Sequence, residues 1–164
     1  MKRRHFIQAG VSAIVLGAIS LTPLSATESA ITPVVLSEDE WRRRLTEAQF
    51  NVLREEGTER PWSSEFNDEK REGTFACAGC DLPLFESAKK FDSGTGWPSF
   101  WAAIDGHTET KRDFKIFFPR TEYHCTRCGG HQGHIFNDGP KPTGKRWCNN
   151  GIALKFIPAD KSAT

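Results

Sequence analysis

The chain has 164 residues, of which 37% are hydrophobic and 26% are charged, enough for one ordinary domain with a modest core. This balance is typical of a globular protein and excludes an intrinsically disordered chain. The formal net charge is +1. Without the basic residues Lys2, Arg3 and Arg4, 19 basic residues (22 less 3) remain against 21 acidic ones. A charge so close to neutral gives no indication of nucleic-acid binding.

The first 26 residues predict an export signal. Lys2-Arg3-Arg4 forms a basic start, a mostly apolar run extends from Phe6 to Leu21, and the small residue Ala26 ends the segment, as in signal peptides. Arg3-Arg4-His5-Phe6-Ile7 resembles a twin-arginine signal, which predicts an exported, periplasmic protein. A plain secretory signal or an uncleaved N-terminal anchor is the alternative.

Two short helices are expected at the start of the domain. We expect residues 27–36 to be a linker, residues 37–158 to form the domain and residues 159–164 to be a C-terminal tail. Ser37-Glu38-Asp39-Glu40 and Thr46-Glu47-Ala48-Gln49 both fit a capping box, which predicts a helix beginning at each. Gly57 is expected to end the second helix.

The chain after Gly73 has the pattern of short strands. Segments rich in β-branched or aromatic residues are separated by Gly, Pro, Asn and Asp, which favours strands joined by turns. The predicted strands are 74–77, 82–86, 115–119, 134–137 and 152–157. The expected fold is mainly β: a compact antiparallel domain of two small sheets, with short helices at its N-terminal edge.

Four of the five cysteines form two C-x2-C pairs, Cys77 with Cys80 and Cys125 with Cys128. Four thiolates from two such turns suit the tetrahedral coordination of Zn2+. The sequence therefore predicts one structural zinc ion that staples two hairpins of the domain. Two disulfides or a redox-active C-x2-C pair are the alternatives, since an oxidising compartment favours both.

The fifth cysteine lies in a group of residues that can carry out chemistry. A cysteine, two histidines, an aspartate, an arginine and an asparagine fall within about twenty residues of a predicted β region: His131, His134, Asp138, Arg146, Cys148 and Asn150. The cationic Arg146, two residues before Cys148, would lie on the same face of a strand and favour the nucleophilic thiolate. The two histidines need a bend between them to share a site, which Gly133 permits. Taken singly, a cysteine of this kind is more often inert core, but the cluster favours catalysis.

Three segments carry a family resemblance: Phe91 to Phe100 (FDSGTGWPSF), Gly133 to Pro140 (GHIFNDGP) and Arg146 to Asn150 (RWCNN). In this order they resemble the peptide methionine-(R)-sulfoxide reductases, the B class of methionine sulfoxide reductases. Thr58-Glu59-Arg60-Pro61 and both C-x2-C pairs match this family as well. The resemblance extends from about residue 37 to residue 158, which is nearly all of the expected domain.

The resemblance implies a role for each matching residue. Cys148 would attack the sulfur of protein-bound methionine sulfoxide and become a sulfenic acid. His131 and His134 would hydrogen-bond to and protonate the departing oxygen, while Asp138, Arg146 and Asn150 would orient and support them. Trp97 and Phe136 would bind the substrate, with Trp97 against its methyl group, which helps to select the R epimer. Simple core packing is the alternative for Trp97.

Thr95 departs from the family pattern. Many members have a second, resolving cysteine in the segment that here reads Gly94-Thr95-Gly96-Trp97. We therefore expect a one-cysteine enzyme whose Cys148 is reduced by an external, thioredoxin-like thiol, and we expect a monomer. A knuckle cysteine that leaves the zinc to resolve Cys148 is the alternative, but loss of a thiolate ligand would weaken the metal site. Two other functions stay open: a non-catalytic zinc-knuckle module that binds proteins, and a thiol–disulfide oxidoreductase using Cys77 and Cys80. The second lacks the βαβ pattern expected beside such a motif.

Overall fold

Two capped helices open the domain in the computed structural model, which describes residues 30–115 and 118–160. The helices are α1 (Glu38–Arg44) and α2 (Glu47–Glu55). Each begins with a complete capping box, at Ser37 and at Thr46, which confirms both predicted starts. The residue that ends α2 with left-handed backbone is Glu56 (φ 57°), so the prediction for Gly57 is wrong by one residue.

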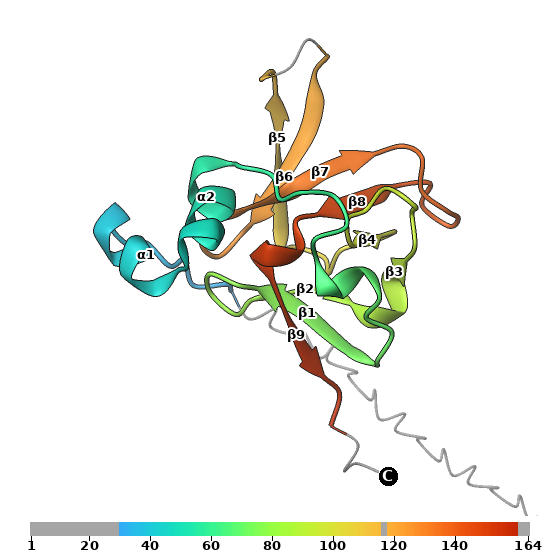
Figure 1. Cartoon of the computed structure of the whole chain (residues 1–164), viewed down its shortest axis with the longest axis horizontal. Coiled ribbons are helices and arrows are strands. Elements are labelled where there is room, and N and C mark those ends of the chain that lie inside the picture. The colour runs from blue at the N-terminus through green and yellow to red at the C-terminus, as the bar shows by residue number, and fades with distance from the viewer. Residues whose placement is uncertain (1–29, 116–117, 161–164) are drawn as a thin grey trace, which may run out of the picture. The chain divides into compact units, whose positions relative to one another are not determined.

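The strands form two antiparallel sheets, which confirms the expected mainly β fold. The smaller sheet has the order β2-β1-β9 and the larger one β3-β4-β8-β7-β6-β5 (Figure 1). The strands are β1 (Gly73–Cys77), β2 (Pro83–Glu86), β3 (Lys90–Phe91), β4 (Ser99–Phe100), β5 (Thr108–Asp113), β6 (Arg120–Cys125), β7 (His131–Phe136), β8 (Arg146–Asn149) and β9 (Leu154–Pro158). Short 3-10 helices lie at η1 (Glu65–Asn67), η2 (Ser87–Lys89) and η3 (Gly151–Ala153).

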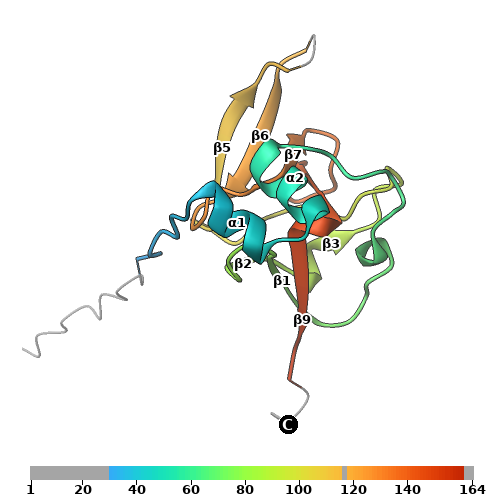
Figure 2. The same ribbon diagram turned by 60° about the vertical axis from the view of Figure 1, so that its left-hand side comes forward.

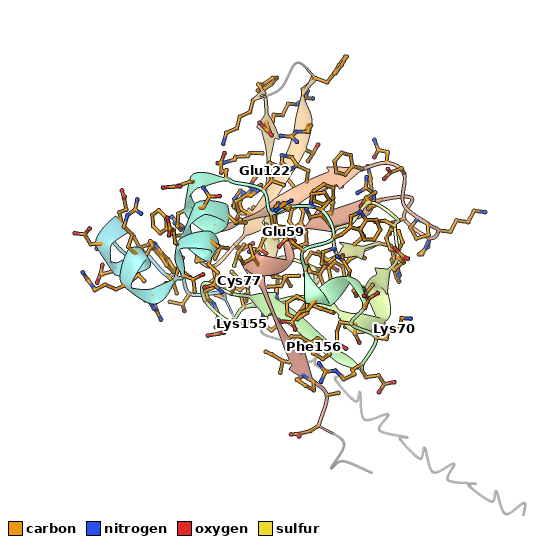
Figure 3. The ribbon with its side chains drawn as sticks, viewed as in Figure 1. Glu59, Lys70, Cys77, Glu122, Lys155 and Phe156 are labelled. Atoms are coloured by element: carbon orange, nitrogen blue, oxygen red, sulfur yellow. The ribbon has the colours of Figure 1, made fainter. Side chains whose placement is uncertain are left out.

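An aromatic core joins the two sheets. Phe75 and Phe85 come from the smaller sheet and Phe100 from the larger one, and all three are fully buried. Phe85 stacks on Phe100 with 4.1 Å between ring centroids, and Phe75 meets Phe100 edge-on at 5.0 Å. Phe156 on β9 continues this cluster (Figure 3). Helix α2 packs against β7 and η3 (Figure 2). Trp147 of β8 meets Phe85 edge-on, with 6.2 Å between ring centroids, so the core also holds strand β8.

Two of the predicted strands require correction. Of the predicted strand 115–119, residues 116 and 117 lie outside the described residues, and Lys115, Phe118 and Pro119 are not in a strand but lie between β5 and β6, whose hairpin projects from the sheet (Figure 1). The apolar residues beside this turn, Phe114 and Phe118, are 69% and 71% exposed. The apolar pattern that predicted a strand here therefore does not come from a buried face of the sheet. In the predicted strand 152–157, the first residues belong to η3 and β9 begins at Leu154.

The predicted export signal, residues 1–26, lies outside the described residues, as do residues 161–164 of the predicted tail. The described residues from 31 onward form one compact unit. In the predicted linker, residues 30–36 have neither helix nor strand, but the backbone N–H of Val34 donates to the carbonyl of Arg127 (2.7 Å). Within the described ranges, no helix is both long enough and apolar enough to cross a membrane.

Candidate active site and metal centre

The four paired cysteines meet where the two sheets adjoin. Cys77 ends β1 and Cys125 ends β6, while Cys80 and Cys128 lie in the turns that follow. Their sulfur atoms all lie within 4.8 Å of one another, with Cys77 3.7 Å from Cys128 and Cys80 3.5 Å from Cys125. Tetrahedral coordination with metal–sulfur bonds of about 2.3 Å would place the sulfurs roughly 3.8 Å apart. The cluster therefore fits a metal ion such as zinc.

The surroundings of this cluster agree with metal binding. All five cysteines are free thiols, and the sulfur separations exceed the about 2.05 Å of a disulfide. Four thiolates this close repel one another unless a cation compensates their charge. The buried Gln132 side chain also donates to the sulfur of Cys77 (3.4 Å), a contact of the kind that supports metal ligands. The cluster lies at the turns of two hairpins, β1–β2 and β6–β7.

Cys148 lies in the middle of the larger sheet at a small pocket. On β8 it is opposite His134 of β7 on one side and opposite Ser99 of β4 on the other. Strands β7 and β8 approach closely here, since a Cβ on Gly133 would lie 1.9 Å from the carbonyl oxygen of Cys148. The pocket has a cavity volume of about 110 Å³ and is lined by Thr58, Trp97, Arg120, Gly133, His134, Phe136, Cys148, Asn149 and Asn150.

Opposing effects act on the Cys148 thiol. Burial raises the pKa of Cys148, while the Arg146 guanidinium and the Thr95 hydroxyl lower it by charge and hydrogen bonding; burial is the larger effect. Two hydrogen bonds to Asp138, of 2.8 and 2.9 Å, hold the Arg146 guanidinium, which also lies over the Phe136 ring (4.3 Å). The Arg146 guanidinium thus lies close enough to Cys148 to act on its thiol.

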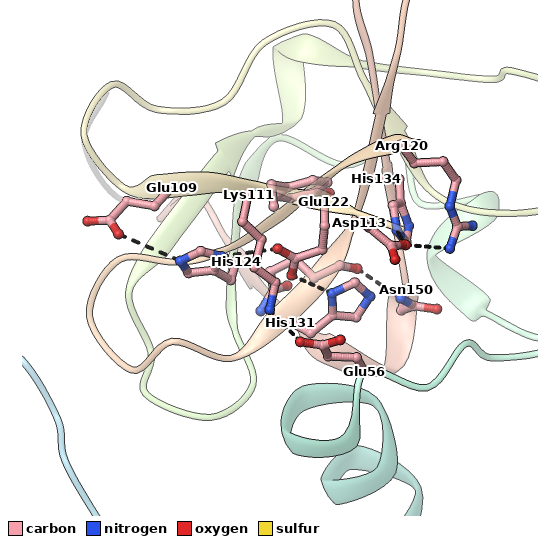
Figure 4. A network of polar contacts seen from close by, with 12 residues as sticks. Glu56, Glu109, Lys111, Asp113, Arg120, Glu122, His124, His131, His134 and Asn150 are labelled. Atoms are coloured by element: carbon pink, nitrogen blue, oxygen red, sulfur yellow. Dashed lines mark hydrogen bonds and ion pairs between the residues drawn. The ribbon is translucent and has the colours of Figure 1, made fainter. Parts of the chain in front are cut away.

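The two histidines come together, each with its own carboxylate (Figure 4). Their ring centroids are 5.5 Å apart, because a bulge between His131 and Gly133 inserts one extra residue into β7. Nδ1 of His131 lies 2.6 Å from Glu122, and Nε2 of His134 lies 2.7 Å from Asp113. Burial lowers the pKa of His134, and the Asp113 carboxylate opposes that shift.

Asp138 therefore contacts Arg146 rather than a histidine. The two carboxylates that hold the histidines were not predicted, since Asp113 and Glu122 lie on β5 and β6, away from every segment that carried the resemblance. His131 is buried beside His134 and is not among the residues that line the pocket.

Trp97 and Asn150 are held in the pocket wall by one loop residue, Glu59. The Trp97 indole donates to the Glu59 carbonyl (3.2 Å), and the Glu59 N–H donates to the Asn150 side chain (3.0 Å). The Glu59 carboxylate accepts hydrogen bonds from the N–H groups of Gly151 and Ile152, near η3 (Figure 3). Asn150 thus binds backbone groups, and it supports the pocket rather than the histidines. Glu59 belongs to a segment quoted for the resemblance, but its role was not predicted.

Comparisons with known proteins agree with this geometry. Residues 45–158 match the model of the SelR domain. The chain is 50% identical to a peptide methionine sulfoxide reductase MsrB of Bradyrhizobium diazoefficiens, over 83% of this chain and 99% of that protein. It is 50% identical to the MsrB of Pseudomonas putida, over 74% of this chain and 92% of the other. The chloroplastic methionine sulfoxide reductase B1 of Arabidopsis thaliana is 49% identical, over 77% of this chain and 63% of its own length. The chain therefore belongs to the SelR domain family.

Proposed function

We propose that this protein reduces the R epimer of protein-bound methionine sulfoxide to methionine, with Cys148 as the nucleophile. The observation that carries the proposal is the pocket itself, where Cys148 lies opposite His134 and shares the wall with Trp97. The names of the relatives describe the same reaction class. A module that only binds proteins would not need a thiol, a histidine and an arginine at one small pocket.

The reaction moves one oxygen atom from the substrate to Cys148. The Cys148 sulfur attacks the sulfoxide sulfur, the S–O bond of the substrate breaks, and an S–O bond to Cys148 forms. The methionine sulfur gains two electrons and the Cys148 sulfur loses two, which gives a sulfenic acid. The proton lost by the Cys148 thiol balances the proton gained by the oxygen, and His131 and His134 transfer these protons. Arg146, held by Asp138, favours the thiolate.

The pocket wall accounts for selection of the substrate. Trp97 and Phe136 supply aromatic surface on which the methyl group of a methionine sulfoxide can pack. Glu59 and Asn150 fix this wall, so that only one arrangement of methyl and oxygen places the oxygen at the histidines. That arrangement is the R epimer in our proposal.

Regeneration of Cys148 requires a thiol from outside the chain. The lining of the pocket contains no second cysteine, and Thr95, which replaces the resolving cysteine of many family members, hydrogen-bonds to Cys148. A first external thiol displaces water from the sulfenic acid and forms a mixed disulfide, and a second thiol releases Cys148. We propose a thioredoxin-like donor, and a monomeric enzyme exported to the periplasm by its twin-arginine-like start.

The four-cysteine cluster is proposed to hold one structural zinc ion. Cys77, Cys80, Cys125 and Cys128 would supply four thiolates, and the ion would compensate their charge. Binding would couple the β1–β2 hairpin to the β6–β7 hairpin, because each contributes two ligands. It would also keep these four sulfurs out of the redox reaction, which leaves Cys148 as the reactive thiol.

One assay tests the proposal. Wild type and Cys148→Ser are given each epimer of an N-acetylated methionine sulfoxide, with dithiothreitol as the reductant. We expect the wild type to consume the R epimer and leave the S epimer, and Cys148→Ser to be inactive. Wild type that leaves the R epimer unreduced would favour a binding module, and equal activity of Cys148→Ser would rule out the assigned nucleophile.

A further inference from the structure

We infer that Glu122 is a positioning residue that fixes the tautomer and orientation of His131. The inference rests on the proposed function, in which His131 handles the proton of the transferred oxygen. Glu122 is on β6, the strand between β7, which carries both histidines, and the outer strand β5. The supporting observations are the contacts, the burial and the charge of this carboxylate.

The contacts of Glu122 form a continuous network inside the sheet (Figure 4). One oxygen lies 2.6 Å from Nδ1 of His131, and the other lies 3.2 Å from Nδ1 of His124. On its outer side, His124 approaches Glu109 (3.6 Å). Because both carboxylate oxygens are engaged, the Glu122 side chain cannot rotate without breaking a contact. The His131 ring is therefore held from its Nδ1 edge.

The contact with Glu122 determines which nitrogen of His131 can act. A carboxylate only accepts hydrogen bonds, so Nδ1 must carry the proton and donate it to Glu122. The other nitrogen, Nε2, is buried and has no hydrogen-bond partner among the described residues. A buried ring nitrogen without a partner is costly, and a substrate atom that contacted it would offset that cost. Nε2 is thus the nitrogen of His131 left for the reaction: in the neutral ring it accepts a proton, and once protonated it can donate to the sulfoxide oxygen.

His134 is held through its other ring nitrogen, Nε2. Asp113 contacts its Nε2 (2.7 Å) and is itself fixed by Arg120 (2.6 Å). In the neutral ring this leaves Nδ1 without the proton, so the two histidines offer different nitrogens. Each ring thus presents an unprotonated nitrogen, Nε2 of His131 and Nδ1 of His134, which accepts a proton first and can donate it only afterwards. Each histidine therefore has its own carboxylate, which holds its tautomer.

The charge of Glu122 distinguishes positioning from simple packing. The side chain is 3% exposed, and burial raises the pKa of Glu122, but hydrogen bonds from His124 and His131 outweigh burial and lower it to about 2. A buried negative charge costs free energy that a neutral side chain of the same shape avoids. Glutamine has nearly the shape of glutamate but no charge. If Glu122 only filled space, glutamine could therefore replace it without effect.

The experiment compares Glu122→Gln with a matched control, Glu109→Gln, which removes the exposed carboxylate on the far side of His124. Nitrogen NMR of 15N-histidine-labelled protein reports which ring nitrogen of His131 carries the proton, and His131→Gln identifies its resonances. In the wild type we expect the proton on Nδ1. In Glu122→Gln we expect a shift toward the Nε2–H tautomer and a fall in kcat of about 10- to 100-fold, with KM within about two-fold. Glu109→Gln should change neither quantity.

The outcomes separate the inference from the proposed function. A wild-type His131 protonated on Nε2 would overturn the inference even if the enzyme reduces the R epimer and even if the variant fails to fold. Unchanged kcat and an unchanged tautomer in Glu122→Gln would overturn it as well. A wild type that lacks reductase activity but has the Nδ1–H tautomer would instead contradict the proposed function, while the assignment of the ring geometry would stand.

Discussion

The four-cysteine cluster and Cys148 place the same thiol group in two different environments. In the four-cysteine cluster the sulfurs face one another and lie at the ends of strands and in turns. Cys148 lies within β8, between β4 and β7, and it faces a pocket with a histidine and an arginine nearby. The difference teaches that neighbouring groups, rather than the thiol itself, decide whether a cysteine binds a metal or reacts.

The location of each centre follows from its task. Turns allow four ligands to adjust to one ion, and a bound ion would tie the two sheets together. A nucleophile must instead be held within a fraction of an ångström of its partners, which a strand with neighbours on both sides achieves better than a turn. Changes in the cluster should therefore affect stability, and changes around Cys148 should affect activity.

The largest effect is expected for Cys125→Ser. This change removes one of four ligands, so we expect loss of bound zinc and about 4 kcal/mol or more of the free energy of unfolding. Metal analysis and urea denaturation measure both quantities. The matched control is Cys148→Ser, which should keep the zinc and the stability of the wild type. Equal zinc content in Cys125→Ser and the wild type would show that the cluster is not the metal site.

A smaller effect, confined to activity, is expected for His134→Gln. Removal of a proton-transferring group opposite Cys148 should lower kcat for the R epimer by about 10²- to 10⁴-fold, with zinc content unchanged. The control is His107→Gln, whose ring contacts the carbonyl of Pro83 and not the pocket. If His134→Gln retained kcat within two-fold of the wild type, His134 would have no part in the chemical step.

The smallest effect is expected for Arg146→Gln. The guanidinium lowers the pKa of Cys148 against the effect of burial, so its removal should raise that pKa further. The rate of alkylation by iodoacetamide, measured from pH 6 to 10, should reach its plateau at a higher pH in the variant. The control is Lys145→Gln, which changes an exposed cation that contacts Asn137. A plateau at the same or a lower pH would contradict the assigned role of Arg146.

Local patterns in the sequence predicted the elements that depend on neighbouring residues. The capping boxes at Ser37 and Thr46 were found because each involves residues three positions apart. The β5–β6 hairpin was missed because β5 is mostly exposed and has no alternation of apolar residues. The exposed residues Phe114 and Phe118 instead predicted a strand at its end. Exposure of apolar side chains therefore caused the error in this region.

The site was predicted in its central residues but not in its support. Cys148, His134 and Trp97 lie in segments with a recognisable order of residues, and the structure brings them to one pocket. Glu122 and Asp113 reach the histidines only because β5, β6 and β7 are neighbours. No spacing along the chain indicates these contacts, since strand order is a property of the folded sheet.

The most direct test of the division between the two centres is to locate the oxidised sulfur after one turnover. The zinc-loaded protein receives one equivalent of the R epimer without reductant, and a dimedone-type reagent then traps sulfenic acid for mass spectrometry of peptides. We expect the label on Cys148 alone, with no disulfide between Cys148 and Cys77, Cys80, Cys125 or Cys128. A label on one of those four cysteines, or a disulfide from Cys148 to any of them, would contradict the assignment of one reactive and four metal-binding thiols.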